Sequence, residues 1–340
     1  MESTFRTPYI LIFFVPCSGI PLVCQTTPLQ GAQVLHPKLA SFFEGHQQNI
    51  RCITQSRDGW WVASADEGGE ISLWEADRGV RRWVTHYGSQ PSPKIVFSPD
   101  GCYLAAFVKS ERNQIGLWDV FSGKKKLVID YGDTSILALA FSADGQQILA
   151  GGNDRIISFW DVKSGHLIKS VAAHDHAVFS LALSEDGKQL ASGSLGEVKI
   201  WDPETGRQIQ NWKFTRWPLV SIAFSPDGHH LAVADSVPKA GPWQGSLALF
   251  CPKTGKVEWT LQGNGQGKSF ACLAFHRSGK CLFAIGSELG VEEYDPTTGR
   301  GIGYFQTMGL PGAMALSPDG KALLVGFDQT ISTIPFGFFR

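Results

Sequence analysis

The stretch Leu181-Ala-Leu-Ser-Glu-Asp-Gly-Lys-Gln-Leu-Ala-Ser-Gly-Ser-Leu-Gly-Glu-Val-Lys-Ile-Trp-Asp202 decides the fold, because it predicts three short strands joined by two tight turns. Apolar residues alternate with small or polar neighbours up to the turn Glu185-Asp-Gly187, where glycine can take a positive φ. The apolar residues that follow predict the return strand. A second turn at Ser194-Leu-Gly196 leads into a third strand that ends at Trp201.

The same unit recurs seven times along the chain. Successive turn glycines lie 42, 44, 42, 41, 51 and 41 residues apart, in the turns Asp58-Gly59, Asp100-Gly101, Asp144-Gly145, Asp186-Gly187, Asp227-Gly228, Ser278-Gly279 and Asp319-Gly320. The residue that ends the third strand recurs in register with these turns, as Trp74, Trp118, Trp160, Trp201, Phe250, Tyr294 and Ile334. A period in the low forties with four strands per unit is typical of a β-propeller, because a lone sheet must pack against neighbours to bury both faces.

Composition excludes several classes of protein. The 340 residues carry a net charge of −1, so no basic excess is available to neutralise nucleic acid phosphates. None of the seven cysteines forms a Cys-x-x-Cys pair, which argues against a zinc site and against a disulfide framework. We therefore expect no nucleic acid partner, no metal and no other cofactor.

The turn sequences and the third-strand endings together resemble the WD40 repeat family over nearly all of residues 36–336. They are Phe97-Ser-Pro-Asp-Gly101, Phe141-Ser-Ala-Asp-Gly145, Phe224-Ser-Pro-Asp-Gly228 and Leu316-Ser-Pro-Asp-Gly320, with Trp118-Asp119, Trp160-Asp161 and Trp201-Asp202. The resemblance implies a buried network of histidine, serine or threonine, aspartate and tryptophan in each complete repeat. The positions that match it are His46, Ser64 and Trp74 in repeat one, His174, Ser192 and Trp201 in repeat four, and Asp154 and Trp160 in repeat three. On this reading the aspartate is missing from repeats one and four, and Gly132-Asp133 replaces Gly-His in repeat three.

The resemblance and the spacing predict an all-β fold, a seven-bladed β-propeller of four-stranded antiparallel blades in one domain, residues 36–336. The repeats are expected at about residues 45–79, 87–123, 130–165, 173–206, 214–255, 262–299 and 304–336. After Phe336 few residues remain for a fourth strand in the last blade. Residues 38–43 align with the outer strand that precedes repeat four, so we expect this N-terminal strand to pair with the last blade and close the ring.

Residues 1–30 match no repeat. The uncharged apolar run Tyr9–Val23, preceded by Arg6 and followed by polar residues, has the layout of a signal peptide. It favours export, periplasmic or secreted, with a mature protein that starts between about residues 20 and 30. The alternative is a disordered or loosely packed extension of a cytoplasmic protein.

Three motifs suggest chemistry, but each has a simpler explanation. Gly263–Ser269 ends like a phosphate-binding loop but has Gln262 in place of its first glycine and continues as a strand. Ser192–Gly196 lacks the first glycine of a nucleophile elbow. Acids recur where the second strand turns into the third and could surround a hard cation, but turn hydrogen bonding explains them better: Asp66, Glu67, Glu111, Asp154, Glu197, Asp235, Glu288 and Asp328.

The one anomalous spacing points to a binding surface. It comes from an enlarged turn, Asp235–Gly245, which carries Trp243 and Lys239. The segment Phe214-Thr-Arg-Trp-Pro218 is expected to be the loop before the first strand of the same repeat, and it carries Arg216 and Trp217. Both loops should open on one face of the propeller. Tryptophan and arginine often dominate the binding energy of protein interfaces, so this face is the predicted binding surface. Alternatively, both rings are buried within the monomer.

The predicted function is that of a non-catalytic scaffold that binds a protein or peptide partner through the loop face, as a monomer with no membrane span. The alternatives are a propeller enzyme, a hydrolase, lyase or oxidoreductase with an acid-lined central site, and an envelope accessory protein resembling the TolB-type propellers. The Trp-Asp endings and the seven copies favour a WD40 protein over the TolB type, and the sequence offers an enzyme neither a nucleophile–base pair nor a ligand cluster.

Overall fold

The computed structural model describes residues 42–88, 94–109, 112–235, 245–262, 270–286, 290–307, 309 and 311–336. These residues all belong to one compact unit, residues 33–340. Trp243, Lys239, the run Tyr9–Val23 and the loop Gly263–Ser269 lie outside the described residues. Among the residues that are described, no helix has the length and apolar character needed to cross a membrane.

The described residues form 27 strands in antiparallel sheets, with no α-helix, so the prediction of an all-β fold built from four-stranded antiparallel sheets is confirmed. One sheet holds β2 (Ile50–Gln55), β3 (Trp61–Asp66), β4 (Glu70–Glu75) and β5 (Arg81–His86). The next holds β6 (Ile95–Phe97), β7 (Tyr103–Lys109), β8 (Asn113–Asp119) and β9 (Lys125–Gly132). A third holds β10 (Ile136–Phe141), β11 (Gln147–Gly152), β12 (Ile156–Asp161) and β13 (Leu167–Ala172).

Repeats four and five share one seven-stranded sheet: β14 (Ser180–Leu183), β15 (Leu190–Gly193), β16 (Leu195–Trp201), β17 (Gln208–Phe224), β18 (Leu231–Asp235), β19 (Ser246–Phe250) and β20 (Val257–Gln262). Repeat six holds β21 (Cys272–Phe275), β22 (Leu282–Ile285), β23 (Gly290–Tyr294) and β24 (Gly301–Gln306). The remaining sheet has the order β1-β27-β26-β25, with β1 (Phe42–Glu44), β25 (Pro311–Leu316), β26 (Ala322–Phe327) and β27 (Thr330–Pro335).

The 17-residue strand β17 belongs to two repeats. Its first part pairs with β16 as the outer strand of repeat four, and its last part pairs with β18 as the first strand of repeat five. The prediction of a loop at Phe214–Pro218 is therefore wrong, because Pro218 pairs with Leu195 and the chain stays extended. A side chain at Gly196, whose φ is +69°, would collide with the Thr215 carbonyl, so glycine there permits this close approach.

The last sheet is completed by the strand from the other end of the described chain. β1 pairs antiparallel with β27, with Phe42 opposite Ser332, Phe43 opposite Ile331 and Glu44 opposite Thr330. Phe43 is fully buried and meets Trp74 edge-on at 5.8 Å between ring centroids. The same junction is joined by the backbone, since the amide of Ile50 donates to the carbonyl of Asp328 at 2.7 Å. The first and last repeats are thus packed and hydrogen-bonded together.

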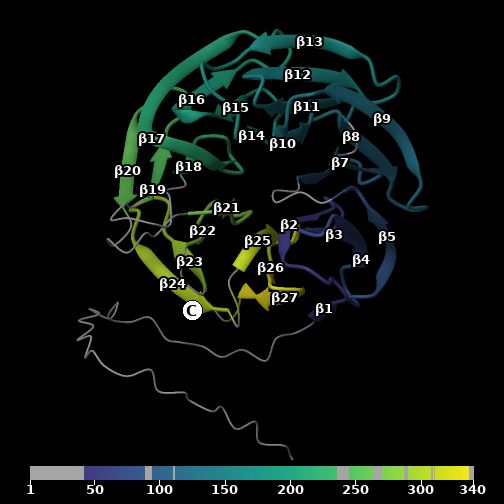
Figure 1. Cartoon of the computed structure of the whole chain (residues 1–340). Coiled ribbons are helices and arrows are strands. Elements are labelled where there is room, and N and C mark those ends of the chain that lie inside the picture. Colours follow the sequence, from purple (N-terminus) through teal and green to yellow (C-terminus); the bar gives the residue numbers. More distant parts are fainter. Residues whose placement is uncertain are drawn as a thin grey trace, which may run out of the picture. The chain divides into compact units, whose positions relative to one another are not determined.

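The core lies between neighbouring sheets. Successive sheets follow one another around a common centre, with β2, β10, β14 and β25 toward the inside and β5, β9, β13 and β20 toward the outside (Figure 1). Each pair of neighbouring repeats shares an apolar cluster, and one such cluster, which includes Ile53, Trp74 and Ile331, joins the last repeat to the first. Each repeat therefore depends on both neighbours for its buried surface.

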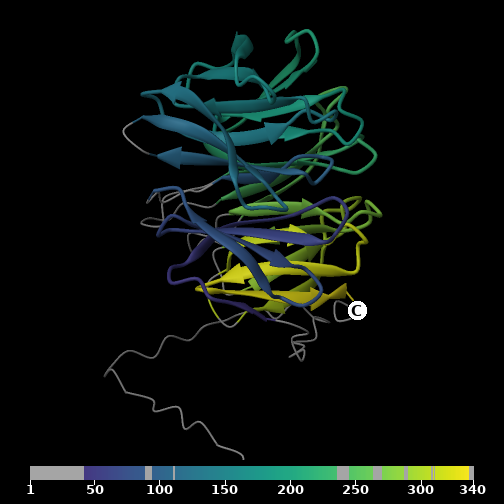
Figure 2. The same ribbon diagram turned by 90° about the vertical axis from the view of Figure 1, so that its right-hand side faces the viewer.

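Because successive strands are antiparallel, turns gather at the two ends of the strands (Figure 2). We call the end with the seven aligned turns the Asp-Gly face. In six of these turns a serine hydroxyl donates to the aspartate two residues later, at 2.5–2.7 Å. In repeat six, His276 and Ser278 make the corresponding contact at 2.7 Å. These local bonds fix the turns.

Candidate functional site

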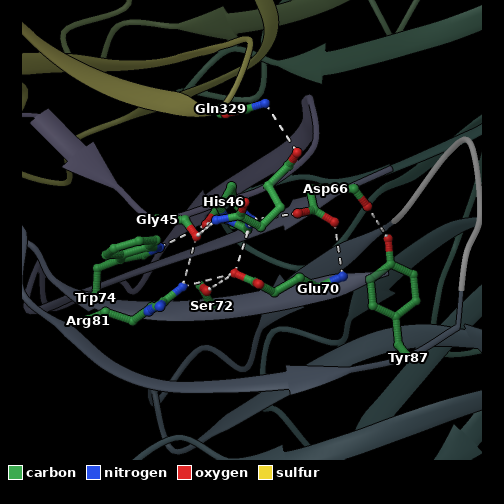
Figure 3. A network of polar contacts seen from close by, with 11 residues as sticks. Gly45, His46, Asp66, Glu70, Ser72, Trp74, Arg81, Tyr87 and Gln329 are labelled. Atoms are coloured by element: carbon green, nitrogen blue, oxygen red, sulfur yellow. Dashed lines mark hydrogen bonds and ion pairs between the residues drawn. The ribbon is translucent and has the colours of Figure 1, made fainter. Parts of the chain in front are cut away.

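A buried polar network lies between β1 and the first full sheet (Figure 3). The indole nitrogen of Trp74 donates to Ser64 Oγ at 2.8 Å, and that hydroxyl lies 2.6 Å from His46 Nε2. The other imidazole nitrogen, Nδ1, lies 2.9 Å from Asp66 Oδ2. The structure thus brings His46, Ser64 and Trp74 together and adds Asp66, so the prediction that repeat one lacks the acid is wrong.

In the tautomer of His46 that carries its proton on Nδ1, this nitrogen donates to Asp66, and Nε2 accepts the proton of the Ser64 hydroxyl, which itself accepts from Trp74. Burial by itself would raise the pKa of Asp66, but the hydrogen bonds from His46 and from the Glu70 amide lower it. The carboxylate is therefore ionised and bonded at both oxygens.

Glu70 approaches the same imidazole and completes a group of possible metal ligands with His46 and Asp66, whose ligand atoms lie within 4.8 Å of one another. The carboxylate of Glu70 already accepts from Ser72 at 2.8 Å and from Arg81 at 3.1 Å. Arg81 also donates to the Gly45 carbonyl and lies over the Trp74 ring, 5.6 Å from its centroid. Because these groups satisfy one another, the cluster is built as a structural relay and not as an open cation site.

Repeat four builds the same relay with a different acid. Trp201 donates to Ser192 at 2.8 Å, Ser192 lies 2.7 Å from His174 Nε2, and His174 Nδ1 lies 2.7 Å from Glu197. The acid is thus present here too, on strand β16 and not in the turn where the family pattern places it. Burial lowers the pKa of His174, so the imidazole stays neutral and donates to Glu197.

Repeat three replaces the histidine by a tyrosine. The hydroxyl of Tyr131 donates to Asp154 at 2.8 Å, and the tyrosine ring lies 6.2 Å from that of Trp160. Trp160 donates to Ser158 on its own strand, because the second strand carries Ala150 where repeats one and four have serine. The sequence predicted Asp154 and Trp160 as members of this network but not Tyr131 and Ser158. The Tyr131-Gly132 pair, which precedes β10 where repeat one has its Gly-His pair, could have indicated the tyrosine.

The three relays coincide with the segments that match a known family. The family model described as "WD domain, G-beta repeat" matches residues 37–75, 124–161 and 165–202, about a third of the chain. These segments contain the Trp74, Trp160 and Trp201 relays. The chain contains three WD40 repeats.

A curated relative matches a short stretch of the chain. Ribosome biogenesis protein ERB1 of Coprinopsis cinerea is 39% identical to the chain over 61 residues, which is 17% of this chain and 8% of the relative. The chain therefore matches only a small fraction of that relative's length. WD40 repeats are typical of proteins that act as interaction scaffolds.

The predicted partner surface is only partly described. Arg216 is exposed on β17, and its guanidinium lies 5.8 Å from the centroid of the half-buried Trp217 ring. Leu195, 38% exposed, pairs with Pro218 on the adjacent strand. The structure thus brings Arg216, Trp217 and Leu195 together at the end of the WD40 repeat opposite the Asp-Gly face. Trp243 and Lys239 lie outside the described residues.

Next to this surface, β18 ends at a buried aspartate. Asp235 pairs with Leu219 of β17, and its Oδ1 accepts from the Ser246 amide at 2.7 Å. Its Oδ2 is buried and has no hydrogen-bond partner among the described residues. Burial therefore raises the pKa of Asp235.

Proposed function

We propose that the chain is a non-catalytic WD40 scaffold, a closed seven-bladed propeller that binds a protein or peptide partner at Arg216 and Trp217. The pairing of β1 with β27 and the shared cluster between the last and first repeats support the closed ring. One domain spanning residues 36–336, with repeats at the spacing expected from the sequence, follows from this proposal.

The observation that carries the binding role is the placement of Trp217 in an extended segment that is anchored at both ends. The strand pairs with β16 up to Lys213 and again at Pro218, and with β18 from Leu219, which lowers the entropy cost of displaying the indole. Arg216 stacks over the ring, and tryptophan and arginine are the residues that most often dominate interface energy. We propose that Trp243 and Lys239 extend this surface.

The test compares variants of the full chain as baits for affinity capture. Trp217→Ala and Arg216→Ala should lower the affinity for the partner that the wild-type chain captures by about 1–3 kcal/mol. Trp60→Ala is the matched control, since Trp60 is 68% exposed in a turn of the Asp-Gly face. Equal recovery of every partner by all four baits would exclude the surface.

A further inference from the structure

The strands around the centre line an open cavity of about 540 Å³. It is lined by the first strands of repeats one to five and by Pro318 of repeat seven, and its wall is largely apolar, with Phe97, Phe141, Leu183 and Phe224 among the lining residues. Arg57 and Pro318 also line a second hollow of about 210 Å³, so the two are adjacent. Both involve turns of the Asp-Gly face, the end of the strands away from Trp217.

Charged side chains line the second hollow, which we call the mouth, from equivalent positions in the aligned turns. The residue between serine and aspartate in the aligned turns is Arg57 in repeat one and Glu185 in repeat four, and the corresponding residue of repeat six is Arg277. The other four turns carry proline or alanine there, Pro99, Ala143, Pro226 and Pro318. The second hollow is lined by all three charged residues, which leaves one positive charge in excess.

One carboxylate is already bound at the mouth. Arg57 Nη2 lies 3.3 Å from Glu185 Oε1, although the two turns belong to repeats separated by two others. The side chains are 60% and 49% exposed, and an ion pair this exposed contributes little to stability. Arg277 donates to the carbonyl of Pro318 at 2.5 Å, which holds its guanidinium at the same opening.

We infer that this mouth binds an acidic, apolar peptide segment in extended form. A carboxylate of the peptide takes the place of Glu185 on Arg57 and reaches Arg277, while a neighbouring apolar side chain enters the cavity. The arginines suit a carboxylate because their planar groups can donate two parallel hydrogen bonds. The lining by Phe97, Phe141 and Phe224 favours burial of an aromatic or aliphatic side chain.

Glu185 acts in this scheme as an internal competitor. It occupies the arginine that the peptide needs, so its removal should strengthen peptide binding, whereas removal of a residue that merely braces the turn would not. The site is independent of the partner surface at Trp217.

The experiment measures fluorescence anisotropy of the labelled peptide Gly-Asp-Phe-Glu-Leu-Asp-Gly with the full chain. Glu185→Gln should tighten binding by about threefold or more, the gain expected when a weak ion pair is removed. The double variant Arg57→Gln, Arg277→Gln should weaken it by about tenfold or more. Arg82→Gln is the matched control, because Arg82 is a half-exposed arginine paired with Glu75 on an outer strand, and it should bind normally.

Two further peptides separate the contributions. Replacement of Phe and Leu by Ser tests the cavity, and replacement of the acids by Lys tests the arginines; both should bind more weakly. The inference is overturned if the double arginine variant binds like the wild type, if Glu185→Gln does not tighten binding, if the lysine peptide binds as well, or if wild type and Glu185→Gln both fail to bind at about 1 mM peptide. Trp217→Ala should leave this peptide's affinity unchanged, so failure here and failure of the partner surface are distinguishable.

Discussion

Two buried aspartates at equivalent strand ends have pKa values that are shifted in opposite directions. Asp66 lies opposite Ile50 and Asp235 lies opposite Leu219, each at the start of the first hairpin of its repeat. In repeat one, His46 precedes Ile50 by four residues. In repeat five, Thr215 precedes Leu219 by the same distance along the chain. At Asp66 the hydrogen bonds, including the one from His46, outweigh burial, whereas at Asp235 burial outweighs the hydrogen bonds. Both carboxylates are buried, so the strength of their hydrogen bonds decides which of them is stable when ionised.

The two aspartates should give opposite pH dependences of stability. The pKa of folded Asp66 is lowered from 3.8, so its contribution is present above about 3.8 and is lost as the pH falls through the folded pKa. The pKa of folded Asp235 is raised from 3.8, so its contribution is present below that value and is lost as the pH rises through the folded pKa.

Asp66→Asn should therefore destabilise at neutral pH, with a deficit that shrinks on acidification, and Asp235→Asn should gain stability relative to the wild type as the pH rises from about 4 to 7. Urea unfolding of each variant and the wild type measures the Asp235 difference between about pH 4 and 7 and the Asp66 difference below about pH 4. Differences of the same sign and the same slope for both variants would contradict the assignment.

At the level of the element, the aligned turns differ in how closely they meet their neighbours. Gly187 and Gly228 both follow aspartate and have φ values of +72° and +70°. A Cβ at Gly187 would lie 2.4 Å from the Cβ of Ala143 in the preceding repeat, whereas a Cβ at Gly228 would meet nothing within 4 Å. Alanine variants at these two glycines therefore separate the free-energy cost of the turn conformation from the cost of the contact between repeats.

Gly228→Ala should cost about 1 kcal/mol, because only the left-handed backbone opposes it. Gly187→Ala should cost roughly 1–3 kcal/mol more, because the neighbouring turn must also move. Urea denaturation of the two variants measures the difference. Equal costs would show that the turns of repeats three and four do not pack as described.

The strands could be predicted because their signals are local. Asp-Gly turns and third-strand aromatics at a regular spacing suffice to predict four-stranded sheets. The loop at Phe214–Pro218 was mispredicted because the extension of β17 depends on Gly196, a residue of the neighbouring strand. The acids of the relays were missed because Asp66 and Glu197 reach the histidine from strands, and the family pattern expects them in a turn.

For the whole molecule, contacts between distant segments were the hardest to predict. Arg57 and Glu185 are 128 residues apart, and no local pattern indicates that they meet. The pairing expected for residues 38–43 rested on alignment with another outer strand; the described pairing covers Phe42–Glu44. The number of blades and the closure of the ring stay predictions that this pairing supports.

The central claim is that β1 completes the last sheet and so holds the ring closed. Phe43 is fully buried against Trp74, and loss of a buried aromatic side chain costs about 3–5 kcal/mol. Removal of residues 1–44 also leaves β27 with an unpaired edge, whereas removal of residues 1–30 leaves β1 intact.

The most direct measurement is the melting temperature of these two truncations beside the full chain, with Phe43→Ala as the point variant. The chain without residues 1–44 and Phe43→Ala should both melt several degrees lower, and the chain without residues 1–30 should melt like the full chain. If both truncations melt at the same temperature, β1 does not close the ring.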